Sequence, residues 1–187
     1  MKKILSLLLV PAVAGCLSSS PRAVSHWPVS YVGPSAAERP AHLGIGRVSQ
    51  VVVRAPYNSE GIPVLRANGT VEHDPYNEFA AQPSTLLKGA LLDAMAASGK
   101  FKTVVNSSSG TRSSAMVEMM VSELALDCRR PNERKAVAKL VVRVLKDGEI
   151  VGLEKGEGFA DAGDGNYGAA FSKAFSDALS ASLARLP

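Results

Sequence analysis

The pattern of hydrophobic and polar positions changes period along the chain, and each change predicts an element. Residues 44–55 are rich in Val and Ile and read as a buried strand. Residues 62–66 and 70–73 are two short β-like segments on either side of Asn68-Gly69, a dipeptide that favours a hairpin turn. We expect Asp74-Pro75-Tyr76-Asn77 to close this hairpin, because proline cannot continue a central strand.

From residue 83 the apolar positions follow a helical period. One stripe is formed by Leu87, Ala90, Leu91, Ala94 and Met95. Ser84 suits the start of this helix and Gly99 its end. A second stripe begins at Phe171 and ends at Leu186, which predicts a C-terminal helix with Asp164 or Asn166 at its N-cap.

Strand-like runs occupy most of the chain between the two helices. They cover residues 101–105, 115–126, 136–145 and 150–159, with the turn-forming Asp147-Gly148 between the last two. Residues 136–145 alternate apolar and polar, so one face of that strand is wet. Strand runs grouped between two helices predict an α+β fold, with a largely antiparallel sheet and both helices packed on one face.

Composition limits the class of protein. The 187 residues suffice for one globular domain, since 46% are hydrophobic and 20% are charged. Lys and Arg number 21 against 17 Asp and Glu. If Lys2 and Lys3 are removed with a leader, the charge becomes 19 − 17 = +2, which gives no reason to expect a nucleic-acid partner.

The N-terminus has the layout of an export signal. Lys2 and Lys3 precede a mostly apolar stretch at residues 4–14, which is far shorter than the roughly 20 residues that span a bilayer. It ends in Val13-Ala14-Gly15-Cys16, which resembles the lipobox of bacterial lipoproteins. The resemblance implies removal of residues 1–15 and covalent acyl chains on Cys16, where two or three chains give durable membrane attachment.

The alternative is a plain A-x-A cleavage site at residues 12–14, which would leave Cys16 without a role. Residues 16–42 are expected to form the acylated N-terminus and a Ser/Pro-rich tether, followed by a single domain at 43–187. Trp27-Pro28 suggests that part of this tether docks as an edge strand, with an exposed aromatic patch as the other interpretation. Leu17 follows the cysteine where Asp would signal inner-membrane retention, so by resemblance the outer membrane is the expected address.

Motifs for catalysis or metal binding are missing from the sequence. It has no phosphate-binding loop, no G-x-S-x-G, no H-E-x-x-H and no C-x-x-C. We therefore predict that the protein is not an enzyme and holds no metal or cofactor. An envelope hydrolase would require His73, Asp74 and a serine to meet in a pocket. Cys128 reads as an inert, half-buried cysteine at a strand end.

A series of short motifs resembles the ABC-type transport auxiliary lipoprotein family, which includes the paraquat-inducible protein C lipoproteins. The motifs are Gly46-Arg47-Val48 through Val53, Ala55-Pro56-Tyr57-Asn58, Leu65-Arg66, residues 71–80, Pro83 and residues 97–101. The resemblance is strongest from about residue 43 to 105. Phe79 stands where the family typically has tryptophan, which retains an aromatic ring but loses the indole donor.

The resemblance implies a lipid-anchored protein of the outer membrane that faces the periplasm. Its expected partner is an MCE-domain (mammalian cell entry) protein of an ABC-type transporter, in a system that moves lipids or other hydrophobic molecules; a homo-oligomer is compatible with this role. For docking we single out Tyr57, Asp74, Pro75, Tyr76, Asn77 and Phe79. Alternatively, these rings pin the hairpin to the first helix. A scaffold or assembly lipoprotein of another envelope machine is the competing function.

Overall fold

The structure is a computed structural model that describes residues 22–35, 41 and 43–186. Its elements in chain order are β1 (Ser25–Trp27), β2 (Ile45–Val53), β3 (Gly61–Leu65), β4 (Val71–Phe79), α1 (Pro83–Ala97), β5 (Thr103–Val105), β6 (Ala115–Asp127), β7 (Lys135–Lys146), β8 (Glu149–Asp161) and α2 (Tyr167–Arg185). The long runs predicted near 115–126, 136–145 and 150–159 are thus confirmed as β6, β7 and β8.

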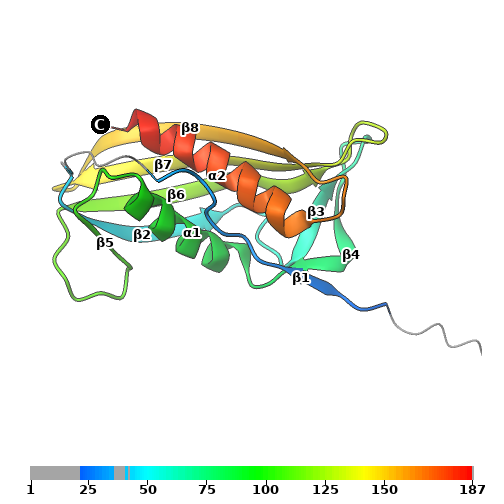
Figure 1. The fold of residues 1–187 in the computed structure, drawn as a ribbon, viewed down its shortest axis with the longest axis horizontal. Helices are drawn as coiled ribbons and strands as arrows, with labels where there is room; N and C mark the ends of the chain where they lie inside the picture. Colours follow the sequence, from blue (N-terminus) through cyan, green and yellow to red (C-terminus); the bar gives the residue numbers. More distant parts are fainter. Residues whose placement is uncertain (1–21, 36–40, 42, 187) are drawn as a thin grey trace, which may run out of the picture.

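The strands form one mixed sheet, so the prediction of a largely antiparallel sheet is wrong. Among the described residues, β1–β4, β2–β5, β2–β6 and β3–β6 are parallel pairs. The antiparallel pairs in the described part of the chain are β3–β4, β6–β7 and β7–β8. The α+β class itself holds, because both helices lie on one side of the sheet (Figure 1).

The parallel pairs arise because β6 enters the centre of the sheet after a crossover. Parallel neighbours require a long connection, usually a helix, and α1 lies between β2 and β6 in the chain. One edge of β6 pairs with β7 along nearly its whole length. Its other edge pairs first with β2 and then, at Leu126 and Asp127, with β3.

The core lies between the helices and the sheet. The predicted stripes of both helices are buried, from Leu87 to Met95 in α1 and from Phe171 to Leu183 in α2. They pack against the alternating residues of β7 that the sequence assigned to one face, Ala136, Ala138, Leu140, Val142 and Val144. Every second side chain of β7 and the apolar stripe of α2 therefore pack together in one apolar layer.

Two glycines let α2 lie directly on β8. A Cβ atom built on Gly156 would come within 2.0 Å of the Ala178 carbonyl oxygen, and one on Gly158 within 1.9 Å of the Ala174 carbonyl oxygen. Real side chains do not approach backbone so closely, so only glycine permits this contact. The spacing of two residues places both glycines on the helix-facing side of the strand.

The β3–β4 hairpin forms around Asn68-Gly69 as predicted, but it does not end at Asp74. Strand β4 continues to Phe79, because the register shifts between Gly61 and Pro63 of β3. Residues 74–76 lie within this shift, where Pro75 gives up no ladder hydrogen bond. From Asn77 onward β4 pairs with β1.

The helix ends partly follow the sequence. Asn166 is the N-cap of α2, and its side chain accepts a hydrogen bond from the Ala169 N–H at 3.1 Å. Ser84 does not cap α1: the helix begins at Pro83 after Gln82, and the Asn58 side chain accepts from the Ser84 N–H at 3.3 Å. Gly99, with φ of 67°, follows the last turn as expected.

Residues 28–33, which follow β1 and which we call the strap, lie along α2. Three serines of α2 at a spacing of four residues bind the strap. Ser172 Oγ accepts from the Ser30 N–H at 3.1 Å and Ser176 Oγ from the Val32 N–H at 2.8 Å. Ser180 Oγ lies 3.0 Å from the Tyr31 hydroxyl. Part of the predicted tether is therefore docked on the body, as the Trp27-Pro28 signal suggested.

We expect Ser176→Ala to loosen the strap. Ser176 is 1% exposed but Val32 is 59% exposed, so water can reach the Val32 N–H, and losing this hydrogen bond should cost about 0.5–1.5 kcal/mol. Hydrogen exchange should show faster exchange at Val32 while the amides of β7 stay protected. Unchanged exchange at Val32 would show that the serine does not hold the strap.

Candidate interaction surface

The strand face opposite the helices alternates apolar and charged rows, read across β6, β7 and β8. One row is Met116–Leu145–Ile150, the next Glu118–Arg143–Leu153, and then Met120–Val141–Lys155. The Glu123–Lys139–Glu157 row follows toward the β6–β7 loop. Directly opposed residues of antiparallel strands point to the same side of the sheet. All these side chains therefore project from the face that the helices do not cover.

Ion pairs bridge the charged rows. Arg143 Nη2 lies 2.7 Å from Glu118 Oε2, and Lys139 Nζ lies 3.1 Å from Glu123 Oε2. The carboxylates of these pairs are only 23% and 18% exposed, so the pairs are partly shielded from water. Each pair joins β6 to β7 across the strands, and the apolar side chains of the neighbouring rows stay accessible.

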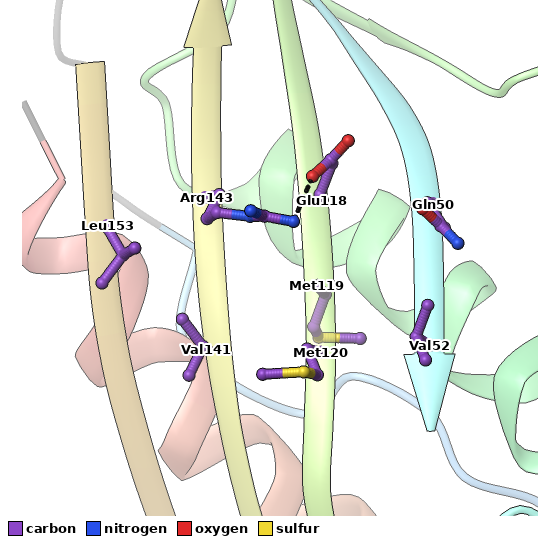
Figure 2. Close-up of a pocket in the computed structure, with 8 residues that line it drawn as sticks. All are labelled: Gln50, Val52, Glu118, Met119, Met120, Val141, Arg143 and Leu153. Carbon is purple, nitrogen blue, oxygen red and sulfur yellow. Dashed lines mark ion pairs between the residues drawn. The ribbon is translucent and has the colours of Figure 1, made fainter. Parts of the chain in front are cut away.

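A shallow hollow of about 270 Å³ lies on this face (Figure 2). Its lining residues are Gln50, Val52, Glu118, Met119, Met120, Val141, Arg143 and Leu153. Figure 2 shows the Glu118–Arg143 pair on one side of the Met120 and Val141 side chains. The hollow is therefore apolar at its base and charged along one side.

Exposed apolar side chains gather beside the hollow, at the β7–β8 turn. We call this group the distal patch: Met116, Ile150, Val151 and Leu153, which are 37–53% exposed. In Figure 1 the β7–β8 turn and β1 lie at opposite ends of the molecule. The twelve residues of β7 correspond to a separation of about 40 Å between the two ends. An exposed apolar group of this kind is typical of a binding surface.

Tyr57 lies at the other half of the same face. Burial, and then the negative charge of Glu123, raise the pKa of the Tyr57 hydroxyl, whereas Lys139 and Arg129 act in the opposite direction. The ring packs against the core and is half-buried. Ala125 and Val137 are buried although they belong to the face without helices. Tyr57 thus stands in a part of the face that is already covered.

The predicted segment from Asp74 to Asn77 is largely occupied by contacts within the protein. Asp74 Oδ1 accepts from the Tyr76 N–H at 2.8 Å, and Asn77 Oδ1 accepts from the Trp27 indole N–H at 2.9 Å. Pro75 and Tyr76 are exposed, and the Arg22 guanidinium lies 5.0 Å from the centre of the Tyr76 ring. Pro75 and Tyr76 are the members of the predicted docking set that offer free surface.

Phe79 belongs to the core. It is 1% exposed, and its ring meets the Phe171 ring edge to face with centroids 5.1 Å apart. A buried ring offers no surface to a partner, so Phe79 corresponds to the alternative in which the rings pin the hairpin to a helix. The ring contact that the structure shows is with α2, whereas the sequence suggested the first helix.

Cys16, the predicted acylation site, lies outside the described residues, as does the whole segment before Arg22. His73 and Asp74 do not form a pair: the His73 Nε2 atom lies 3.4 Å from the Pro56 carbonyl oxygen. Within the described part of the chain, no group of three or more His, Cys, Asp or Glu residues could hold a metal ion. No helix in that part is long and apolar enough to cross a membrane.

Cys128 is a free, half-buried thiol at the end of β6. Burial raises the pKa of this thiol, and the positive charges of Arg134 and Arg66 only partly oppose the rise. Because the thiolate is the reactive form, we expect alkylation of Cys128 at pH 8 to be slower in the folded protein than in urea. The rate should still rise above pH 9. A rate that levels off by pH 8 would contradict the raised pKa.

The distal patch does not follow from the sequence analysis above, because its residues come from β6 and β8, which only the sheet brings together. A usable signal is present in residues 150–159, where Ile150, Leu153 and Phe159 are large apolar residues on the side away from the glycines. Similarly, Gly156 and Gly158 at a spacing of two in a strand indicate a closely approaching backbone.

Known proteins share this fold at low sequence identity. No family model matches the chain, and no curated protein does. The chain is similar in structure to a Xanthomonas campestris protein of the DUF330 family, with a TM-score of 0.67, 17% identity, and 83% of this chain and 90% of that chain covered. An uncharacterised protein gives a TM-score of 0.57 at 12% identity, covering 84% of this chain and 95% of its own. These likenesses concern the fold alone.

Proposed function

We propose that the protein is a membrane-anchored periplasmic accessory lipoprotein of an ABC-type transport system with an MCE-domain component. In this role it carries no catalytic site. Acyl chains on Cys16 hold one end at the outer membrane, and the body docks to the envelope-spanning component of a system that moves lipids or other hydrophobic molecules. The family motifs of the sequence and the DUF330-like fold support this proposal.

One observation carries the mechanism: β1, which follows the predicted anchor in the chain, and the exposed apolar surface lie at opposite ends of the sheet. The chain enters the body at β1, whereas the distal patch lies at the β7–β8 turn (Figure 1). With the first end held at a membrane, the second faces away from it. A partner reaching across the periplasm would therefore meet Ile150 and Leu153.

β1 and the strap together limit how far the body extends from the membrane. If β1 stays paired with β4, nine residue steps separate Cys16 from Ser25, and they span at most about 30 Å. Release of both β1 and the strap, as far as Leu43, would raise this limit to about 90 Å. The docked β1 and strap therefore keep the body close to the membrane.

Cross-linking in cells tests the docking. A photoreactive residue in place of Leu153, 50% exposed in the distal patch, should capture an MCE-domain protein. The matched control replaces Lys173, an exposed residue of α2 in an ion pair with Asp177. Mass spectrometry identifies the captured protein. Capture of a component of another envelope machine from position 153 would overturn the transport role in favour of a scaffold lipoprotein.

A further inference from the structure

The free edge of β8 presents an unusually long row of backbone groups. Among the described residues β8 pairs only with β7, and it is thirteen residues long. The other two terminal strands, β1 and β5, have three residues each. Long unpaired edges are sites where an extended chain can add a strand.

The direction of the backbone groups follows from one contact. Arg185 Nη2 donates to the Lys155 carbonyl oxygen, so that carbonyl points away from β7. In an antiparallel ladder the N–H and C=O of one residue point to the same side and alternate along the strand. Leu153, Lys155, Glu157 and Phe159 therefore direct their backbone groups to the free edge. Their side chains lie on the face without helices and are exposed.

A second copy of the chain does not fit this edge. Two β8 strands in antiparallel register around Gly156 would pair Lys155 with the Glu157 of the second copy. However, α2 lies directly over Gly156 and Gly158, so the two α2 helices would be one strand spacing apart, about 5 Å. Packed helices need 8–10 Å between their axes. The occupant must be a strand without a helix above it.

We propose that the β8 edge binds an extended segment of a partner protein by adding it as an antiparallel strand. Along the segment, the side chains on the open face would be apolar, basic, acidic and apolar, opposite Phe159, Glu157, Lys155 and Leu153 in turn. The charges come from the exposed Glu157 and Lys155 side chains, and the apolar ends match Leu153 and Phe159, which are 50% and 51% exposed. The segment joins the distal patch at Leu153.

Arg185 covers part of this edge. Its guanidinium holds the Lys155 carbonyl and lies 2.9 Å from Glu154 Oε2. A bound strand would take over the Lys155 carbonyl, because its own N–H donates there. Arg185→Ala should therefore increase the affinity for the segment.

Two synthetic peptides test the proposal on the purified full chain. Val-Thr-Lys-Thr-Glu-Thr-Val matches the edge, and Val-Thr-Glu-Thr-Glu-Thr-Val places an acid opposite Glu157. We expect the first to bind about fivefold more tightly than the second, since one cross-strand pair changes from attraction to repulsion. Glu157→Lys should reverse this preference. Glu149→Lys, the same charge change outside the paired stretch, should leave it unchanged.

Binding is read from peptide fluorescence anisotropy, and melting curves show that each variant is folded. No binding of the matched peptide at about 1 mM would overturn the proposal, as would a preference that Glu157→Lys does not reverse. The inference rests on the proposed function only for the identity of the partner. Failure of the peptides leaves the capture from position 153 intact, and failure of that capture leaves peptide binding intact.

Discussion

Gly158→Ala is expected to destabilise the fold by about 3 kcal/mol, near the upper limit for one added methyl group in a packed interior. The new Cβ would meet the Ala174 carbonyl oxygen at 1.9 Å, and a helix backbone cannot move aside as a side chain can. The helix α2 must lift from β8, which weakens its contacts along the core. Urea unfolding followed by circular dichroism measures the change in the free energy of unfolding.

Gly89→Ala is the matched control for this prediction. Gly89 lies inside α1, is exposed, and a Cβ built there meets nothing within 4 Å. The same substitution should stabilise the protein by about 0.5–1 kcal/mol, because alanine loses less backbone freedom than glycine in a helix. Equal losses at positions 89 and 158 would contradict the close approach of α2 to β8.

Phe79→Ala should cost about 3–5 kcal/mol of stability, the range for removing a fully buried aromatic ring. The ring is 1% exposed and packs edge to face on Phe171, so its loss leaves a cavity between β4 and α2. Thermal unfolding measures the loss. We expect partner capture to fall only in proportion to the fraction of unfolded protein.

Tyr76→Ala separates docking from folding. Tyr76 is 43% exposed, so its removal should change stability by less than about 0.5 kcal/mol. If Tyr76 belongs to a docking surface, partner capture should fall while stability is kept. A loss of stability at Tyr76 equal to that at Phe79 would show that both rings serve the fold, and would remove this segment from the docking hypothesis.

The sequence was sufficient for elements whose burial repeats within one segment. The stripe from Leu87 to Met95 and the alternation from Ala136 to Val144 reflect a single buried face each, and both were predicted correctly. Strand pairing is different, because it depends on residues far apart in the chain. The parallel pairing of β6 with β2 and β3 produces no repeating pattern of apolar residues within any one strand, so the sequence of a strand does not reveal its partners.

Two predictions made from single residues, a strand end at Pro75 and a helix cap at Ser84, were wrong for physical reasons. A proline ends a ladder only where an N–H donor is needed at its position, and the shift of register between β3 and β4 removes that need at Pro75. Ser84 would have capped α1, but Asn58, a residue distant in the chain, supplies the acceptor instead. Docking residues were equally hard to find, because Phe79 and Tyr76 carry similar rings and only the tertiary fold buries the first.

The most direct test of the proposed envelope role is the intact mass of the protein purified from its native host. We expect a chain that begins at Cys16, heavier than its amino acids by the acyl chains that fix it to the membrane. A mass that matches an unacylated chain would contradict this, because nothing would then hold the β1 end at a bilayer or turn the distal patch toward a partner.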